Sequence, residues 1–349
     1  MAVLPSQRIR DAIERRIIQA AEPIGEPQIQ PASLDLRLGV RGYELRASFI
    51  PGAEYSIEAR ISHARLALRE LDLTTPITLR PGNVYLIELL EHLNLPPDIK
   101  ARANPRSTTG RADLFARLLC DYSSEFEGVP AGYQGKLYVE LVPRTFSIRL
   151  QKGTRINQLR FIHGLDSEED LPVRRQQSLL SVDLTPEAGT RIIGYRARRN
   201  APVLDFDGIA CHDRFDYWDP IVMGELRSLV LNPDDFYILR SRERVQLDPV
   251  TAAELMPYES SFGEFRVHYA GFLDPGFGYT GGAHGTPVGL EVRARDVPFL
   301  VEDGQVMGVV VYFGLEERAD KLYGAQIGSA YQRQGIALGK QFRPLTQAE

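Results

Sequence analysis

The sequence predicts a mainly β protein, built from two tandem copies of one β-rich domain with a short helix at the N-terminus. Three observations predict this fold class: alternating apolar segments between glycines and prolines, a single helical periodicity near the start, and a long internal repeat. The chain of 349 residues is 43% hydrophobic and 25% charged, which is ordinary globular composition and gives enough length for two cores.

Residues 6–19 predict the helix, because isoleucines recur there at helical spacing and Ser6 can cap the N-terminus. Strands are predicted next. Apolar and polar residues alternate in "KLYVELV" (136–142), "TFSIRL" (145–150) and "RINQLRF" (155–161), with glycine or proline in the turns around them.

The second half of the chain repeats the first at a nearly constant offset. Tyr85 and Tyr237 are 152 residues apart (237 − 85 = 152), and Glu140 and Glu291 are 151 apart (291 − 140 = 151). A register that holds from residue 85 to residue 161 indicates a tandem duplication.

The repeat divides the chain into three parts. Residues 1–165 are predicted as the first domain and residues 200–349 as the second. We expect residues 166–199 to be a connector, because this segment opens with the acidic "DSEED" and ends with the basic "RARR".

Composition and charge exclude several classes of protein. The net charge of −5 argues against binding a nucleic-acid polymer, which usually requires a basic excess. The longest apolar runs, at 84–90 and 306–313, are far shorter than the roughly 20 residues of a membrane-spanning helix, so no membrane association is expected. Two cysteines, Cys120 and Cys211, are too few for a disulfide framework, and we expect a reducing cytoplasm.

The segment "NPRSTTGR" (104–111) is the first candidate for a binding site. Two guanidiniums, Arg106 and Arg111, flank the hydroxyls of Ser107 and Thr108. Phosphate oxygens accept hydrogen bonds from both kinds of group, so the segment can cradle a polyphosphate. A solvated polar turn is the alternative.

The second copy of this segment reverses its charges. Glu259 and Glu264 in "ESSFGE" stand where Arg106 and Arg111 stand in the first half. Carboxylates repel a triphosphate, so we expect the second copy to have kept its fold and lost this binding role.

A carboxylate in an apolar strand is the second candidate. Glu291 lies in "VGLEVRA" (288–294), after a hairpin whose turn contains Asp274, Pro275 and Gly276. It can face solvent, or it can lie in a partly desolvated pocket where its pKa rises and it becomes a useful general base.

Five segments stand in order along the chain: "IQPASLDLRLG" (29–39), the Arg-Ser segment (106–111), "AGFLDPGFG" (270–278), "VGLEV" (288–292) and "YGAQIGSAYQRQG" (323–335). Taken together and in this order, they resemble the dCTP deaminase family of the dUTPase-like superfamily, in its long, duplicated bacterial form. The resemblance covers nearly the whole chain except the connector and implies tandem dUTPase-like β-barrel or jelly-roll domains.

The resemblance implies hydrolytic deamination of the cytosine ring of dCTP to give dUTP and ammonia, a step toward dTTP. It implies no catalytic metal, with Mg²⁺ bound to the triphosphate. It further implies dCTP and dUTP as ligands, dTTP as a possible inhibitor and a homo-oligomeric assembly.

In this family a glutamate like Glu291 activates the attacking water, and Glu140 is the alternative base in the first half. Ser107 and Arg111 assist catalysis, Asp274 resembles the residue that holds the deoxyribose, and Tyr323 belongs to a tail that closes over the nucleotide. The substrate-binding residues that the resemblance implies are Arg106, Ser107, Thr108, Arg111, Ala270, Asp274, Leu290, Tyr323 and Gln334.

The sequence departs from the family pattern in complementary places. The tail has Ala330 where the family has a lysine, and the first half reads "GVPAGYQG" (128–135) without the Asp-Pro-Gly turn. We therefore predict one composite site, with arginines from the first half and Asp274, Glu291 and the tail from the second. This model favours Glu291 over Glu140 as the base, and pairing within a chain or a chain dimer over a strict trimer.

Other functions remain open. The zinc-dependent deaminase motifs H-x-E and P-C-x-x-C do not occur. A dUTP pyrophosphatase or a bifunctional deaminase and pyrophosphatase would use the same fold, and a non-catalytic nucleotide sensor would keep the pocket without turnover.

Overall fold

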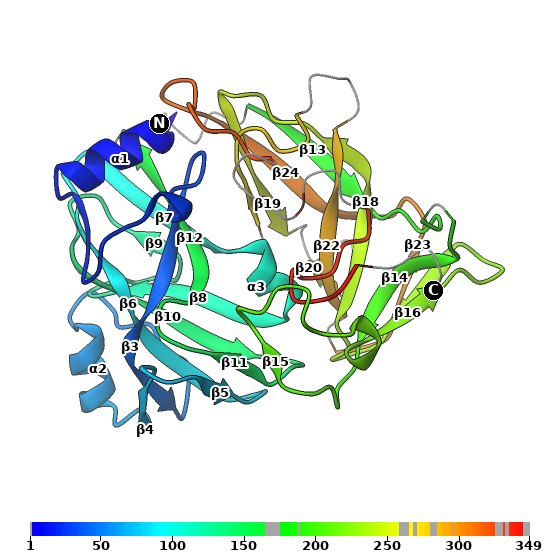
Figure 1. The fold of residues 1–349 in the computed structure, drawn as a ribbon, viewed down its shortest axis with the longest axis horizontal. Coiled ribbons are helices and arrows are strands. Elements are labelled where there is room, and N and C mark those ends of the chain that lie inside the picture. Colours follow the sequence, from blue (N-terminus) through cyan, green and yellow to red (C-terminus); the bar gives the residue numbers. More distant parts are fainter. Residues whose placement is uncertain are drawn as a thin grey trace.

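The computed structural model describes most of the chain and confirms a mainly β architecture. The described residues are 2–164, 175–187, 189–257, 265–267, 271–279, 285–294, 296–324, 331 and 335–344. Figure 1 shows the two halves side by side, with the short helix α3 at the boundary between them.

The first half contains one large sheet, three short α-helices, the 3-10 helix η1 (Glu26–Gln28) and part of a smaller sheet. Its elements are β1 (Ala2–Val3), α1 (Ser6–Glu14), β2 (Ile18–Ala20), β3 (Leu34–Leu45), α2 (Ile57–His63), β4 (Ala67–Asp72), β5 (Ile77–Leu79), β6 (Val84–Asn94), β7 (Ile99–Pro105), α3 (Ser107–Arg111), β8 (Leu114–Cys120), β9 (Gly128–Val129), β10 (Gln134–Pro143), β11 (Ile148–Leu150) and β12 (Arg155–His163). The large sheet has the strand order β8-β10-β6-β3-β12-β7-β9, with β1, β2 and β4 paired beside this path.

The second half has two larger sheets and a two-stranded one. Its elements are β13 (Arg175–Ser181), β14 (Ile192–Ala197), β15 (Leu204–Asp205), β16 (Trp218–Val222), β17 (Ser228–Leu231), β18 (Tyr237–Val245), β19 (Thr251–Pro257), β20 (Phe265–Val267), β21 (Phe272–Leu273), β22 (Thr286–Ala294), β23 (Phe299–Glu302) and β24 (Val306–Gly314). The sheets have the orders β13-β24-β19-β21, β16-β14-β18-β22-β20 and β17-β23.

Equivalent strand pairs in the two halves confirm the duplication. In the first half Glu140 pairs with Leu86, and in the second Glu291 pairs with Ile238, which keeps the offset of the sequence repeat. The paired tyrosines also make the same contact: the hydroxyl of Tyr85 accepts a bond from the backbone N–H five residues earlier (3.0 Å), as does that of Tyr237 (2.9 Å).

Two segments of the predicted connector are strands of the second half. Strand β13 pairs with β24, and β14 pairs with β16 and β18, so residues 175–181 and 192–197 belong to the sheets of the second half. They correspond to β3, since β3 pairs with β12 and β6 in the same way. The charged residues at 166–170 and 196–199 led to the prediction of a connector in place of these strands. Charge density is a weak guide to where a sheet begins.

The N-terminal helix is shorter than predicted. It ends at Glu14, and Ile18 already belongs to a strand. Pro5 occupies the N-cap position, and Ser6 does not cap the helix, because it is the first helical residue and its hydroxyl bonds to Asp320.

The main core joins both halves. It combines the interior of the large sheet with residues such as Tyr195, Trp218 and Phe342 from the second half. Trp218 is fully buried and lies edge-on to Phe146 and Phe342, so it belongs to this core. No helix among the described residues is long and apolar enough to cross a membrane.

Candidate active site

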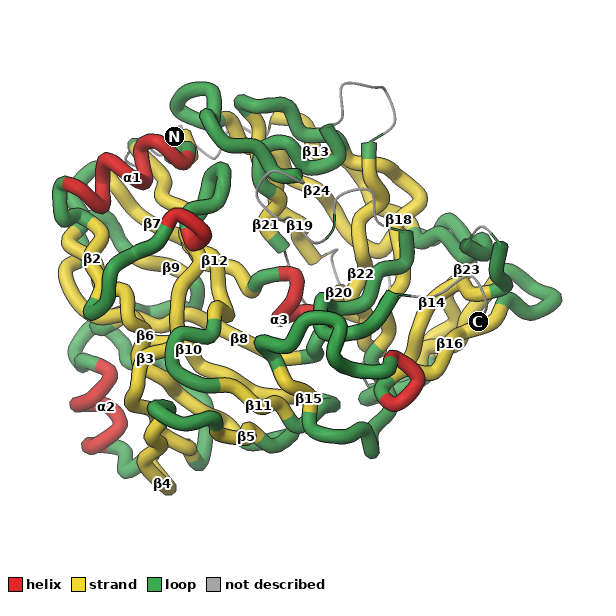
Figure 2. The backbone as a smooth tube through the Cα atoms, viewed as in Figure 1, coloured by secondary structure: helices red, strands yellow, loops and turns green. Residues whose placement is uncertain are grey.

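A cavity of about 290 Å³ lies between the two halves. Figure 2 shows α3, the helix that carries the Arg-Ser segment, at this boundary, whereas α1 and α2 lie on the outer side of the first half. The polar residues that line the cavity come from the first half (Gln30, Asp35, Arg106, Ser107, Thr108, Arg111, Arg155, Gln158), from the second (Asp274, Glu291) and from the C-terminal segment (Tyr323, Tyr331, Lys340).

Strand β22 presents one face to this cavity. Because side chains alternate along a strand, Gly289, Glu291 and Arg293 share a face, while Leu290 and Val292 enter the core of the second half. A side chain at Gly289 would meet the Arg111 guanidinium at 2.6 Å, and Arg293 forms a buried ion pair with Asp113. Glycine at position 289 therefore lets β22 pack closely against the end of α3.

Glu291 and Arg111 form the electrostatic centre of the site. The distance from the Arg111 Nε to the Glu291 Oε1 is 3.7 Å, and both side chains are almost completely buried. Burial raises the pKa of Glu291 to about 8, although the Arg111 charge acts in the opposite direction. A carboxyl group with such a pKa can accept and return a proton near neutral pH.

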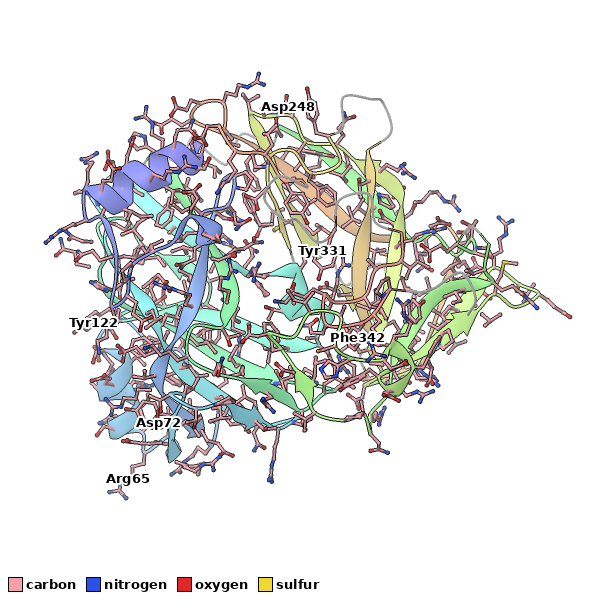
Figure 3. All side chains as sticks on the ribbon, viewed as in Figure 1. Arg65, Asp72, Tyr122, Asp248, Tyr331 and Phe342 are labelled. Atoms are coloured by element: carbon pink, nitrogen blue, oxygen red, sulfur yellow. The ribbon has the colours of Figure 1, made fainter. Side chains whose placement is uncertain are left out.

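The C-terminal segment holds Arg111 from the other side. The Arg111 Nη1 donates to the carbonyl of Ala337 (2.6 Å), and the guanidinium carbon lies 3.8 Å from the centre of the Tyr331 ring. The Tyr331 hydroxyl is 3.2 Å from the Thr108 Oγ1. Figure 3 shows Tyr331 between the two halves, so this residue connects the tail to the Arg-Ser segment.

A buried carboxylate organises the basic end of the cavity. The Asp35 Oδ1 lies 3.0 Å from the Arg106 Nε, and the Asp35 Oδ2 lies 3.4 Å from the Arg155 Nη1. Burial raises the pKa of Asp35, and the two guanidiniums oppose that effect. Asp35 thereby holds both guanidiniums in place, and both arginines line the cavity.

The turn that contains Asp274 joins the halves. The Asp274 Oδ1 accepts a hydrogen bond from the backbone N–H of Ala32 (2.8 Å), and burial raises the pKa of Asp274 to about 7. Gly276 has a φ of 95°, and a side chain there would meet the backbone of Tyr323 at 2.7 Å. Tyr323 donates its N–H to the carbonyl of Pro275 (2.8 Å), so the turn also fixes the start of the tail.

The first half contains the same turn without its carboxylate. In each half a strand residue donates its N–H to the carbonyl of the turn's aromatic residue: Leu95 to Tyr133 (2.8 Å) and Leu247 to Phe277 (2.9 Å). Pro130 then occupies the position of Asp274. This copy of the turn therefore has no side chain that could bind a hydroxyl group of a ligand at that position.

Most of the predicted site residues meet in this cavity. It is lined by Arg106, Ser107, Thr108, Arg111, Asp274, Glu291 and Tyr323. Leu290 is an exception: strand alternation buries its side chain completely in the core of the second half. Ala270 and Gln334, together with the Glu259 and Glu264 of the acidic segment, lie outside the described residues. The chemical roles of all these residues remain predictions.

Glu140, the alternative base, lies elsewhere. It is completely buried and accepts a hydrogen bond from the Arg117 Nε at 3.1 Å. Tyr138 lies on the same face of β10, where it clusters with Ile57 and Ile61 of α2. Helix α2 thus covers in the first half the face that borders the cavity in the second.

Sequence reasoning missed three charged residues of the cavity. Asp35 could have been found, because it is a carboxylate in the apolar strand "SLDLRLG", which is the signal that singled out Glu291. Arg155 and Lys340 gave no such signal, since only the fold brings them beside Arg106. Within the described ranges, no three or more His, Cys, Asp or Glu residues are arranged to hold a metal ion.

Comparisons with known proteins agree with this architecture. The N-terminal domain model of 2'-deoxycytidine 5'-triphosphate deaminase matches residues 1–165, and the C-terminal domain model matches residues 152–342. A crystal structure of 2'-deoxycytidine 5'-triphosphate deaminase from Agrobacterium tumefaciens is 41% identical, with a TM-score of 0.84, and the match covers 91% of this chain and 99% of that one.

Shorter relatives match about half of the chain. A dCTP deaminase from Natronomonas pharaonis is 30% identical over 197 residues, which are 53% of this chain and 93% of the relative. A dUMP-forming dCTP deaminase from Aquifex aeolicus is 32% identical over 163 residues, which are 46% of this chain and 80% of the relative. Since the two domain models together extend from residue 1 to 342 and a solved deaminase shares the fold over nine-tenths of the chain, this protein belongs to the dCTP deaminase family.

Proposed function

We propose that this protein hydrolyses dCTP to dUTP and ammonia in the cavity between its halves, with Glu291 as the general base. One observation carries the proposal: a buried carboxylate beside Arg111 shares a cavity with the guanidiniums of Arg106 and Arg155. The carboxylate can transfer protons to and from the cytosine ring, and the guanidiniums of Arg106 and Arg155 can bind a polyphosphate.

The proton transfers follow from the position of Glu291. Ionised Glu291 accepts a proton from a water molecule whose oxygen bonds to C4 of the cytosine ring, and passes this proton to the ring N3. Glu291 then takes the proton of the new C4 hydroxyl and gives it to the exocyclic amino group, so that the C4–N bond breaks, ammonia leaves and the C4 carbonyl forms. Water and dCTP are consumed and dUTP and ammonia are formed, so Glu291 ends in its starting state. Arg111 stays charged and keeps the carboxylate oriented during the cycle.

The remaining groups bind the nucleotide. Arg106, Ser107 and Thr108 hold phosphate oxygens, and Asp274, fixed by the backbone of Ala32, accepts a hydrogen bond from the deoxyribose. Tyr323 closes one side of the cavity. We propose that Mg²⁺ arrives on the triphosphate and stays bound to its oxygens and to water.

Product identity separates this proposal from a bifunctional enzyme. Some relatives are named dUMP-forming, and cleavage of dUTP would require a carboxylate free to hold Mg²⁺ and water at the phosphates. Asp35 is the carboxylate that lines the cavity beside Arg106 and Arg155, and its two oxygens already contact these guanidiniums. We therefore favour dUTP as the product. We also propose dTTP as a competing ligand and a homo-oligomeric assembly.

The test is product analysis with dCTP and Mg²⁺. We expect dUTP and ammonia in equal amounts from the wild-type protein, and neither from Glu291→Gln. Accumulation of dUMP would show the bifunctional activity. Nucleotide binding without turnover would support the non-catalytic sensor and refute the deaminase activity.

A further inference from the structure

The C-terminal segment adds a third cation to the basic end of the cavity. We propose that Lys340 binds the triphosphate of the nucleotide together with Arg106 and Arg155, and so contributes to selection of triphosphates over less charged nucleotides. The inference rests on the proposed function, because it assigns a further residue to the same ligand.

Lys340 lies at the end of the cavity that also contains Arg106 and Arg155. It is half-buried, it lines the cavity, and its charge interacts with those of Arg106 and Arg155. Within the described part of the chain, its ammonium group forms no ion pair with a carboxylate at 4 Å or less. The two nearby carboxylates have other partners: Asp35 contacts the two arginines, and Asp207 accepts a hydrogen bond from the Thr154 hydroxyl.

Lys340 interacts with two cations, Arg106 and Arg155, and with two carboxylates, Asp35 and Asp207. Asp35 already contacts both arginines. Burial lowers the pKa of Lys340, and Arg106 and Arg155 lower it further. A bound polyphosphate would relieve the repulsion among the three cations and would accept charge-assisted hydrogen bonds from the ammonium group.

The backbone of Lys340 is anchored in the wall of the cavity. The N–H of Ala210 donates to the carbonyl of Lys340 (2.9 Å), and the N–H of His212 donates to that of Gln341 (3.0 Å). Gln341 is fully buried and donates its Nε2 to the carbonyl of Phe206 (3.0 Å). The next residue, Phe342, packs against Tyr217 and Trp218 in the main core, and Figure 3 shows it below Tyr331. Binding an anion therefore requires ordering only the lysine side chain.

The same segment links the two functional ends of the cavity. Ala337 accepts the hydrogen bond from Arg111, and Lys340, three residues later, lies beside Arg106 and Arg155. In Figure 1 this last segment of the chain runs past α3. One stretch of the tail thus holds the arginine next to Glu291 and supplies a cation for the phosphates.

The experiment compares Lys340→Gln with a matched control, Lys136→Gln. Lys136 is an exposed lysine outside the cavity, and its Nζ lies 3.0 Å from the Glu88 Oε1. Binding of inorganic tripolyphosphate is measured by calorimetry, and kcat and KM are measured with dCTP and Mg²⁺. We expect Lys340→Gln to weaken tripolyphosphate binding and to raise the KM for dCTP by at least about tenfold, with kcat within about threefold of wild type. Lys136→Gln should match wild type, and Lys340→Arg should restore most of the affinity.

The two proposals fail in different ways. If Lys340→Gln binds tripolyphosphate and dCTP as tightly as Lys136→Gln does, the role of Lys340 is refuted while the deaminase activity of the wild type stands. If the wild-type protein does not deaminate dCTP, the proposed function fails whatever Lys340 does. Loss of affinity in Lys340→Arg as large as in Lys340→Gln would also overturn the assignment, because it would indicate a change of fold and not of charge. Thermal unfolding of each variant identifies such a change independently.

Discussion

Replacement of Glu291 by glutamine keeps the shape of the side chain and removes its ability to accept a proton. The carboxylate lies 3.7 Å from the Arg111 Nε and lines the cavity, and we assign it no contact with phosphate. General base catalysis contributes about 10²–10⁴-fold to a rate. We therefore expect kcat for dCTP to fall by about 10³-fold or more, with the dissociation constant for dCTP within about tenfold of wild type.

The same substitution should change stability in a pH-dependent way. Raising the pKa of Glu291 from 4.5 to about 8 penalises its ionisation in the folded state by roughly 5 kcal/mol. The folded protein keeps the proton up to about pH 8, whereas the unfolded chain releases it near pH 4.5, so the wild type loses stability as the pH rises between these values. Glutamine does not ionise. Glu291→Gln should thus unfold at a higher temperature than wild type at pH 9 and at a similar temperature at pH 5.

Ammonia release measures the first effect, and calorimetric melting at the two pH values measures the second. Glu140→Gln is the matched control, because Glu140 is the equivalent residue of the first half and does not line the cavity. We expect it to remain active. An active Glu291→Gln together with an inactive Glu140→Gln would refute the assignment of the base to the second half.

Three further predictions concern protonation, phosphate binding and the number of sites. The kcat/KM for dCTP should rise with pH up to about 8, because only ionised Glu291 accepts a proton from water; a flat profile between pH 6 and 9 would contradict this mechanism. Arg106→Ala should cost about 2–5 kcal/mol of binding energy for dCTP and much less for deoxycytidine, as measured by competitive inhibition; equal losses would exclude a phosphate contact. Titration of dCTP and Mg²⁺ into Glu291→Gln should give one site per chain. The double variant Glu259→Ala, Glu264→Ala should keep its turnover. Two equivalent sites per chain, or a double variant that is folded but inactive, would show that the acidic segment takes part.

The sequence predicted those features that depend on periodic patterns or on charge. Strand alternation identified the β-rich class, the repeat identified the duplication, and the arginines of 106–111 with Glu291 identified residues that share a cavity. Features that depend on partners distant in sequence were missed. Arg155 and Lys340 lie beside Arg106 only after the chain folds, and strands β13 and β14 became visible only through their pairing with β24 and β18.

The contrast between Glu140 and Glu291 explains how a duplicated chain comes to have one such cavity. Both carboxylates occupy the same position in equivalent strand pairs, so the sheet alone does not distinguish them. What differs is the element that covers each face. In the first half α2 fills the face with apolar side chains, and Arg117 neutralises Glu140. In the second half Gly289 leaves room for the guanidinium of Arg111, which brings the Arg-Ser segment of the other half against Glu291. Gly289 on β22 and the helix α2 over β10 thus decide that Glu291, and not Glu140, faces a cavity.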